Sequence, residues 1–193
     1  MPPIDPGVGF IFLAAGRGKR FGRDKLTQDF RGQPLWSWVA LAAEEAGFAQ
    51  RYIVSGPHSA IPARSGWHAV TNDRAAEGMG TSIAAGVRAA QDCSRVVIAL
   101  ADMPFVEPAH LRLLAETGGP VFTRYASGAE GSPAGFPRSI FDRLCALQGE
   151  AGARSLGLAD ASAIAPASAA TLADIDTPED LLALSSQNPA GRR

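Results

Sequence analysis

The sequence contains few of the residues that build disulfide frameworks or zinc sites. Its 193 residues include two cysteines, Cys93 and Cys145, and three histidines without metal-ligand spacing. Two cysteines in a chain of this length form neither a disulfide framework nor a zinc motif, so we expect both to be small core residues in a reducing compartment. The histidines, His58, His68 and His110, are expected to be structural or to lie at the surface.

An excess of charge of either sign is also missing. Lys and Arg total 18 and Asp and Glu total 19, which gives a net charge of -1. No global basic field is present that would attract nucleic acid. No apolar run is long enough to span a membrane, and the apolar segment 8–16 lacks the basic stretch that precedes a signal-peptide core. We therefore expect a cytoplasmic protein without nucleic-acid or membrane partners.

Apolar runs alternate with helical patterns along the chain. The predicted strands cover 8–13, 51–55, 67–71, 95–102, 120–124 and 172–176. The predicted helices cover 34–48, 78–92, about 107–116, 139–148, 152–160 and a last segment that Thr177 caps. This alternation predicts a Rossmann-like three-layer α/β fold with a mostly parallel central sheet. We expect a single domain over residues 1–184 and a flexible C-terminal tail over 185–193.

The stretch LAAGRGKRFGRDKL, residues 13–26, follows the first predicted strand and contains three glycines and five basic residues. Ligands of such sheets bind beyond the carboxyl ends of the strands, so this position predicts a binding loop. A P-loop is excluded because Leu13 stands where its first glycine belongs and Arg20 where Ser or Thr belongs. The dinucleotide fingerprint fails at Phe21, its third glycine position.

The same stretch resembles the signature loop of nucleotidyltransferases that join an NTP to a phosphorylated acceptor, L-A-A-G-x-G-x-R-[MF]-G-x-x-K. Small residues in such a loop let base and ribose lie against the backbone, and glycines bring amide N–H groups to the phosphates. Basic side chains neutralise the phosphate charge. The alternative is a solvated basic turn. The expected nucleotide contacts here are Leu13, Ala14, Ala15, Gly16, Arg17, Gly18, Arg20 and Lys25.

Two further segments predict contacts with the same ligand. Asp102 ends the strongest predicted strand and Asp176 follows the last one, and carboxylates at strand ends can hold Mg²⁺ beside a triphosphate. Asp174, two residues earlier, is a further candidate, and all three could instead be turn or cap residues. In EGMGTSIAAG, residues 77–86, the candidate nucleotide contacts are Gly78, Gly80 and Ser82, and the alternative is an ordinary glycine-rich helix entry.

Taken together, these stretches resemble the molybdenum cofactor nucleotidyltransferases, in order from Phe10 to about Leu184. LAAG at 13–16 and ADMP at 101–104 are similar to the cytidylyltransferase form, whereas the guanylyltransferase form typically has LAGG. The resemblance implies a Mg²⁺-dependent transfer of CMP from CTP to the phosphate of molybdenum-molybdopterin, with release of pyrophosphate. Lys25 would neutralise the α-phosphate, Arg20 would hold the pyrophosphate, and Asp102 and Asp176 would hold the metal.

The resemblance also suggests where the acceptor binds. GSPAGFP at 131–137 and GEAGARSL at 149–156 are similar to segments that face the pterin acceptor, which makes Ser132, Glu150 and Arg154 candidate contacts. The family commonly has Gly-His-Pro where this chain has Gly-Ser-Pro, and serine does not titrate near neutral pH. Besides CTP and a pterin phosphate, maturation factors of molybdoenzymes are conceivable partners.

Other functions remain open at this point. A guanylyl donor is disfavoured only by Ala15 and Ala101, and transferases acting on sugar phosphates or methylerythritol phosphate usually have longer chains. A nicotinamide-dependent oxidoreductase would need the fingerprint that Phe21 interrupts. A non-catalytic nucleotide-binding module would not need the two acids at the strand ends.

Overall fold

A seven-stranded sheet forms the centre of the protein in the computed structural model, which describes residues 3–16 and 24–186. The strand order is β5-β4-β1-β6-β8-β7-β9, and β8 runs antiparallel to its neighbours whereas the other pairs are parallel. The strands are β1 (Val8–Leu13), β4 (Gln50–Ser55), β5 (His68–Thr71), β6 (Arg95–Leu100), β7 (Val121–Arg124), β8 (Glu130–Pro137) and β9 (Ser162–Ile164). The mostly parallel sheet confirms the predicted fold class.

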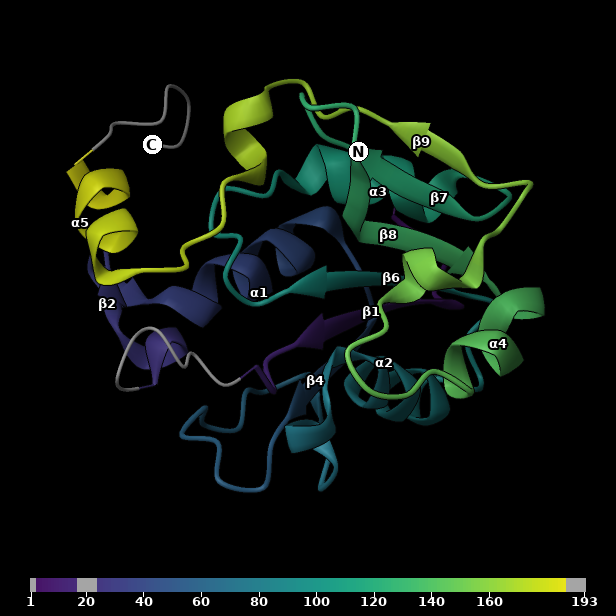
Figure 1. Cartoon of the computed structure of the whole chain (residues 1–193), viewed down its shortest axis with the longest axis horizontal. Helices are drawn as coiled ribbons and strands as arrows, with labels where there is room; N and C mark the ends of the chain where they lie inside the picture. Colours follow the sequence, from purple (N-terminus) through teal and green to yellow (C-terminus); the bar gives the residue numbers. More distant parts are fainter. Residues whose placement is uncertain (1–2, 17–23, 187–193) are drawn as a thin grey trace.

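Helices cover both faces of this sheet (Figure 1). Helices α1 (Leu35–Ala46) and α3 (Pro108–Glu116) pack together on one face, and α2 (Met79–Ala89) and α4 (Phe141–Cys145) pack together on the other. The last helix, α5 (Pro178–Ser186), lies beside the hairpin of β2 (Asp29–Phe30) and β3 (Gln33–Pro34). No helix in the described part of the chain has the length and apolar character needed to cross a membrane.

The central strands β1 and β6 have almost continuous apolar sequences because both of their faces are buried. In β1, Phe10 and Phe12 belong to the core under α1 and α3, whereas Ile11 and Leu13 belong to the core under α2 and α4. Successive side chains of a strand point to opposite faces, so a strand between two helical layers needs apolar residues at every position. Residues 8–13 are accordingly all buried.

One predicted strand is absent from the structure, and two strands of the main sheet were not predicted. Residues 172–176 do not pair with any strand of the sheet. A 3-10 turn, Ala169–Leu172, ends at the start of this segment. The extended chain after it donates a backbone hydrogen bond from Ile175 N to Asp102 O at 3.0 Å. Buried Leu172 and Ile175 gave this segment its strand-like pattern. Strands β8 and β9 were not predicted; β8 contains prolines, which are uncommon inside strands. Pro133 is tolerated there since it lies at a register shift, where a strand residue needs no ladder donor.

Two predicted helices are shorter than expected. The segment 152–160 contains only a 3-10 turn, Ala153–Leu156, which ends at Gly157 in a left-handed conformation with φ 55°. The segment 139–148 contains a 3-10 turn, Arg138–Ile140, followed by α4. Further 3-10 turns cover Lys25–Thr27 and Ala75–Glu77. The other predicted helices and strands differ from the structure by a few residues at their ends.

Candidate active site

Three segments meet at the carboxyl edge of the parallel strands. Strands β1 and β6 are neighbours, and beyond their ends Ala101 N donates a hydrogen bond to Leu13 O at 3.1 Å. The backbone bond from Ile175 N to Asp102 O brings the segment before α5 to the same place. The loop after Leu13, the turn at Asp102 and Asp176 are therefore adjacent. Asp176 reaches this place although it does not belong to a strand.

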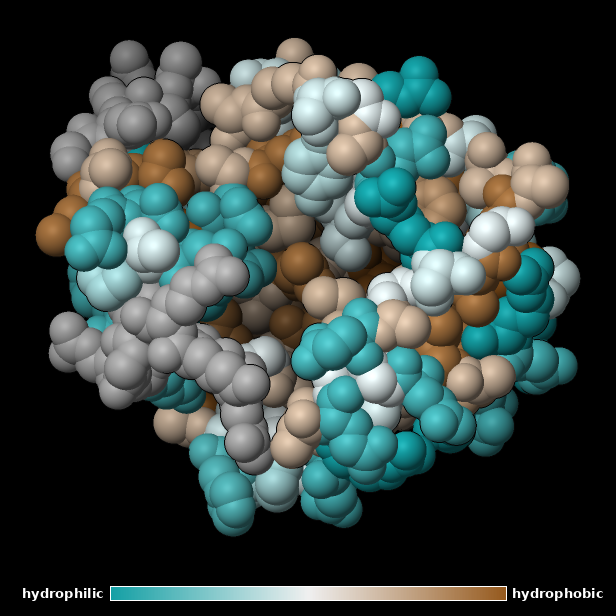
Figure 2. Space-filling view, in the orientation of Figure 1, coloured by the Kyte–Doolittle hydropathy of each residue, from teal (hydrophilic) through white to brown (hydrophobic). Residues whose placement is uncertain are grey.

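A cleft of about 430 Å³ opens where these segments meet. Figure 2 shows a central hollow with apolar surface at its base and polar side chains around its rim. This volume is in the range of small-molecule sites. The cleft is lined by Leu13, Ala15, Gly16, Lys25, Leu26, Ala75, Ala76, Gly78, Met79, Ser82, Leu100, Ala101, Asp102, Glu150 and Asp176.

Lys25 lies at the centre of an ion-pair cluster in this cleft. Its Nζ is 2.8 Å from Asp102 Oδ2 and 3.2 Å from Asp176 Oδ1. The side chain of Lys25 is 10% exposed, so most of its stem is buried while its charge is paired. Asp24 fixes the start of the 3-10 turn here, because its carboxylate accepts a hydrogen bond from Leu26 N at 3.1 Å. Lys25, Asp102 and Asp176 thus converge as the sequence predicted.

Asp176 is held in place by the cap of α5. Thr177 and Asp180 form a capping box, in which Asp180 N donates to Thr177 Oγ1 at 3.1 Å and Thr177 N donates to Asp180 Oδ2 at 2.8 Å. Asp176 N donates to the same carboxylate at 3.1 Å. The hydrogen bonds with Thr177 and Asp176 lower the pKa of Asp180. By contrast, burial raises the pKa of Asp174, and the charges of Asp176 and Asp102 raise it further.

The two carboxylates fit a divalent cation shared with a bound ligand. Asp102 Oδ1 is buried and has no hydrogen-bond partner among the described residues, so one of its oxygens is free to accept a cation. Within residues 3–16 and 24–186, no group of three or more His, Cys, Asp or Glu side chains is positioned to hold a metal. Mg²⁺ and similar ions bind through one or two carboxylates when substrate phosphates and water complete their shell.

The glycines at the start of α2 have a packing role. Gly80 N donates to Gly149 O at 2.8 Å, and a Cβ at Gly80 would lie 2.8 Å from the carbonyl oxygens of Gln148 and Ala151. A Cβ at Gly78, whose φ is 128°, would lie 2.4 Å from Gly149. These glycines therefore let the loop 148–151 reach the cleft. Gly78 also lines the cleft, whereas Gly80 does not.

Ser82 lies in the wall of the cleft, where its hydroxyl accepts a hydrogen bond from Asn72 Nδ2 at 2.9 Å. Ala14 is buried beside the cleft, and its N–H donates to Val54 O. The predicted contacts Arg17, Gly18 and Arg20 lie outside the described residues. Sequence patterns gave no sign of Ala75, Ala76 or Met79, because small and apolar cleft residues carry no distinctive chemistry.

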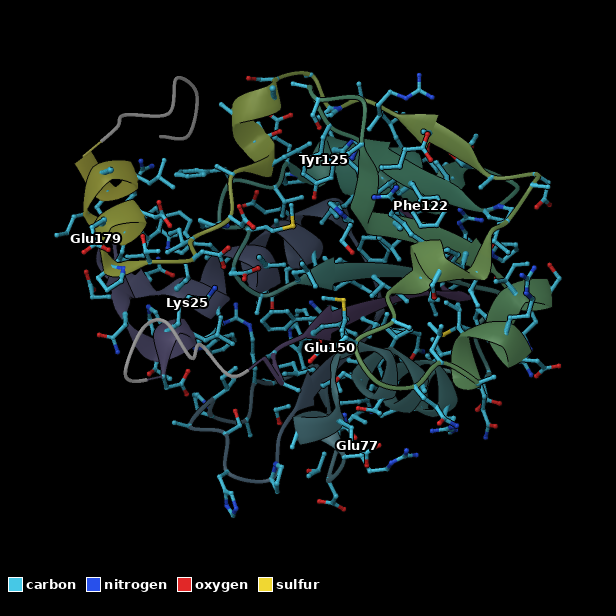
Figure 3. All side chains as sticks on the ribbon, viewed as in Figure 1. Lys25, Glu77, Phe122, Tyr125, Glu150 and Glu179 are labelled. Atoms are coloured by element: carbon cyan, nitrogen blue, oxygen red, sulfur yellow. The ribbon has the colours of Figure 1, made fainter. Side chains whose placement is uncertain are left out.

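The three acceptor candidates do not come together. Glu150 lines the cleft (Figure 3), whereas Arg154 lies in a 3-10 turn and Ser132 in β8, and neither lines the cleft. The carbonyl of Ser132 accepts a hydrogen bond from Tyr125 Oη at 2.5 Å. Burial raises the pKa of Tyr125, and the nearby charges of Asp174 and Asp102 raise it further. The segment around Ser132 is therefore anchored to Tyr125, the residue that follows β7.

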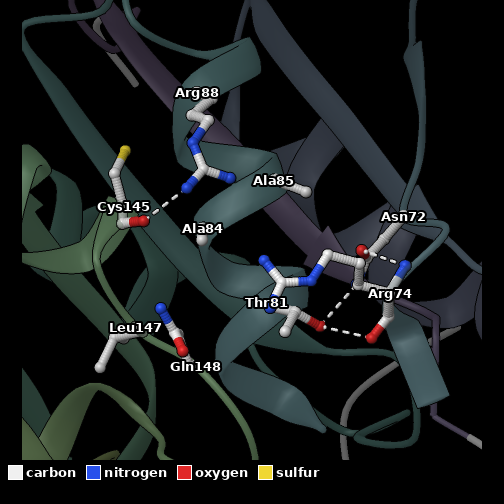
Figure 4. Close-up of a pocket in the computed structure, with 9 residues that line it drawn as sticks. All are labelled: Asn72, Arg74, Thr81, Ala84, Ala85, Arg88, Cys145, Leu147 and Gln148. Atoms are coloured by element: carbon white, nitrogen blue, oxygen red, sulfur yellow. Dashed lines mark hydrogen bonds between the residues drawn. The ribbon is translucent and has the colours of Figure 1, made fainter. Parts of the chain in front are cut away.

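A second, smaller pocket of about 60 Å³ lies between α2 and the chain after α4 (Figure 4). Arg74 and Arg88 line it, but both are already engaged. Arg74 forms an ion pair with Glu77 at 2.7 Å, and Arg88 Nη2 donates to the carbonyl of Cys145 at 2.6 Å. With both arginines paired and a volume well below that of small-molecule sites, this pocket is a poor candidate for catalysis.

Comparisons with known proteins identify two curated relatives of this chain. PucB, a purine catabolism protein of Bacillus subtilis, is 31% identical over 188 residues, which cover 88% of this chain and 92% of PucB. Nicotine blue oxidoreductase of Paenarthrobacter nicotinovorans is 36% identical over 104 residues, so the chain spans about half of that relative, 51%.

Solved structures show the same fold. The crystal structure of Rv0371c from Mycobacterium tuberculosis superposes with a TM-score of 0.76 at 28% identity and covers 94% of this chain and 99% of its own. The same protein has been solved in complex with manganese, with a TM-score of 0.73 at 26% identity and the same coverage of both chains. A family model for the MobA-like NTP transferase domain matches residues 10–164. The chain belongs to the family of MobA-like NTP transferases, and the cleft between β1, β6 and α2 is its candidate active site.

Proposed function

We propose that the protein transfers CMP from CTP to the phosphate of molybdenum-molybdopterin, with Mg²⁺ as its cofactor. The observation that carries this proposal is the convergence of Lys25, Asp102 and Asp176 in the cleft that Ala15 and Gly16 also line. A cation beside two carboxylates and a glycine-containing loop is the chemistry that a triphosphate and its metal require. Membership of the family supports the nucleotidyl transfer itself.

In the proposed reaction, a phosphate oxygen of the acceptor attacks the α-phosphorus of CTP, and the bond to the β-phosphate oxygen breaks, releasing pyrophosphate. Both substrates are anions, so the protein's task is to position them and to neutralise charge. Lys25 would donate hydrogen bonds to the α-phosphate oxygens, and Arg20 would hold the pyrophosphate. Asp102 and Asp176 would hold Mg²⁺, which when bound neutralises charge on the phosphates.

The preference for CTP over GTP is proposed from two alanines in the cleft. Ala15 and Ala101 both line it, and each adds a methyl group that a glycine would lack. These methyl groups take up space in the cleft, which favours the smaller pyrimidine base of CTP over the purine base of GTP. Replacement of Ala15 by glycine is expected to narrow the preference for CTP over GTP, measured as the ratio of the two kcat/KM values, and an unchanged ratio would remove Ala15 from base selection.

Reconstitution tests the proposal directly. Purified protein is incubated with molybdenum-molybdopterin, Mg²⁺ and each of CTP, GTP and ATP, and pyrophosphate release and the dinucleotide product are measured. We expect product with CTP only in the presence of both Mg²⁺ and acceptor. Turnover with GTP alone would redirect the proposal to a guanylyltransferase.

A second candidate function, reduction or oxidation with a nicotinamide cofactor, is favoured by one observation, the partial similarity to nicotine blue oxidoreductase. Thermal unfolding distinguishes the two. A ligand at a hundred times its dissociation constant adds about 2.7 kcal/mol of stability, which raises the melting temperature of a domain of this size by roughly 5–10 °C. We expect this shift with CTP and Mg²⁺. A shift with NADH and none with any NTP would favour the oxidoreductase.

A further inference from the structure

The ammonium group of Lys25 lies between the two carboxylates proposed as metal ligands. The distances from Nζ are 2.8 Å to Asp102 Oδ2 and 3.2 Å to Asp176 Oδ1. An ammonium and a divalent ion both bind carboxylate lone pairs, and their positive charges repel each other at such short range. Lys25 in this position therefore competes with a metal ion for the same oxygen atoms.

The backbones of Asp102 and Asp176 are held by hydrogen bonds that do not involve Lys25, and each carboxylate is joined to its backbone by a single carbon. Asp102 O accepts the hydrogen bond from Ile175 N, and the capping box of Thr177 and Asp180 holds the backbone of Asp176. The backbone of Lys25 is held as well, since its carbonyl accepts a hydrogen bond from Gln28 N at 3.2 Å, and its ammonium contacts the two carboxylates. Its four-carbon stem has several rotatable bonds. The movable partner of this cluster is thus the lysine.

Lys25 satisfies this pair of carboxylates incompletely. Asp102 Oδ1 is buried without a hydrogen-bond partner among the described residues, and a buried charged oxygen in that condition is costly. A divalent ion accepts several oxygen ligands at once and so offers Asp102 a stronger partner than one ammonium. A divalent cation would therefore satisfy the two carboxylates better than the ammonium of Lys25 does.

We infer that Lys25 is an exchangeable occupant of the cation site, which neutralises Asp102 and Asp176 in the free protein and moves to the nucleotide phosphates when the divalent ion binds. This inference rests on the proposed nucleotidyl transfer at the same cleft. Metal alone binds weakly, because it must displace the ammonium without giving it a new partner. Nucleotide supplies that partner, so metal and nucleotide strengthen each other's binding.

Binding of Mn²⁺ alone tests the exchange without any turnover. Free Mn²⁺ is followed by electron paramagnetic resonance as the protein is titrated with metal in the absence of nucleotide. Lys25→Met is expected to bind Mn²⁺ at least about tenfold more tightly than the unmodified protein, within the usual range of coupling between two ligands. Lys25→Met combined with Asp102→Asn should lose this gain. Equal Mn²⁺ affinity of Lys25→Met and the unmodified protein would overturn the inference.

Arg74→Met is the matched control, because it also removes one positive charge but from a side chain paired with Glu77 outside the cleft. It should bind Mn²⁺ as the unmodified protein does. If Arg74→Met gained as much affinity as Lys25→Met, the effect would come from net charge and the inference would fail. Should Lys25→Met unfold in the absence of metal, its melting temperature is measured against Mn²⁺ concentration, and a rise larger than that of the unmodified protein supports the exchange.

A separate titration of the unmodified protein distinguishes this inference from the proposed function. Mn²⁺ affinity is measured with and without CTP. Tighter Mn²⁺ binding with CTP, together with the gain in Lys25→Met, supports the exchange. Tighter binding with CTP but no gain in Lys25→Met overturns the exchange and leaves the nucleotide site intact. A gain in Lys25→Met with no effect of any NTP supports Lys25 as occupant of a cation site and removes the nucleotide from the proposal.

Discussion

Two ion-pair clusters in this protein show how similar chemistry can serve structure or function. On α1, Glu44 accepts hydrogen bonds at 2.7 Å from Arg64 Nε, Arg64 Nη2 and Trp67 Nε1, so both of its carboxylate oxygens are used. In the cleft, Lys25 joins Asp102 and Asp176, and Asp102 Oδ1 has no partner within the described residues. The first cluster is complete within the protein, whereas the second leaves one buried carboxylate oxygen that the proposed ligand would use.

The hydrogen bonds that Glu44 accepts change its pKa. The hydrogen bond from Arg64 lowers the pKa of Glu44 to about 2, against the opposing effect of burial, and the indole of Trp67 lowers it further. The carboxylate fastens the loop between β4 and β5 onto α1 through Arg64 and Trp67. A carboxylate with both oxygens bonded inside the protein stabilises the fold, and its geometry is set by those partners.

The largest expected effect is on the cleft cluster of Lys25, Asp102 and Asp176. Asp102→Ala should lower the transfer rate about a hundred- to thousand-fold, or about 3–4 kcal/mol, because it removes a charged group from the site of phosphate chemistry. The protein should remain folded. The measurement is kcat with CTP and acceptor, together with circular dichroism. Asp160→Ala, at an exposed position away from the cleft, is the control. Turnover of Asp102→Ala close to that of the control would exclude Asp102 from the mechanism.

The next effect tests the packing of the loop 148–151 against the start of α2. Gly80→Ala should cost about 1–3 kcal/mol of stability, because its Cβ would meet the backbone of the loop 148–151. The loop carries Glu150, so ligand binding should weaken as well. Thermal unfolding with and without CTP measures both. Gly118→Ala is the matched control, since no atom lies within 4 Å of the Cβ it would add. Equal melting temperatures of the two variants would contradict the close packing.

A smaller effect is expected in the cluster of Glu44, Arg64 and Trp67. Glu44→Gln should lower the free energy of unfolding at pH 7 by about 1–2 kcal/mol, a figure reduced for solvent screening of a partly exposed group. The folded pKa is about 2 and the ordinary value is 4.5, so this contribution is present above pH 4.5 and is lost as the pH falls toward 2.

Urea unfolding of both proteins at pH 7 and pH 2 checks the sign. The difference between Glu44→Gln and the unmodified protein should shrink at the lower pH. Glu45→Gln, at the next and exposed position of α1, should change stability by less than about 0.5 kcal/mol. Transfer activity should stay unchanged in both variants, and a loss of activity in Glu44→Gln would break the division between the two clusters.

The smallest effect concerns the support of Asp176. Thr177→Ala removes the hydroxyl that accepts from Asp180 N and should cost about 1 kcal/mol, as loss of a helix N-cap does. Thr177→Ser keeps the hydroxyl and should retain most of the stability. Comparison of their melting temperatures measures the cap. If both variants melt at the same temperature, the capping box does not hold Asp176 in place.

Local patterns in the sequence were sufficient for the order of most elements. Buried β1 and β6 are continuous apolar runs because helices cover both sheet faces, and this pattern is visible in one dimension. The position of Lys25 and Asp102 in one cleft was predicted because ligands of such sheets gather at the carboxyl ends of strands, whereas their direct ion pair was not. Strand β8 was missed because the register shift that accommodates Pro133 depends on the partner strand β7 and has no signal in the sequence.

The sequence by itself determined the α/β fold class, the family resemblance and the position of the acids at the ends of segments, because these follow from periodicity and short-range spacing. Tertiary structure alone decided that Asp176 reaches the cleft from an extended segment, that Glu150 lines it while Ser132 and Arg154 do not, and that Lys25 lies between two carboxylates. These outcomes depend on contacts between residues far apart in the chain, and such contacts leave no periodic signal in the sequence.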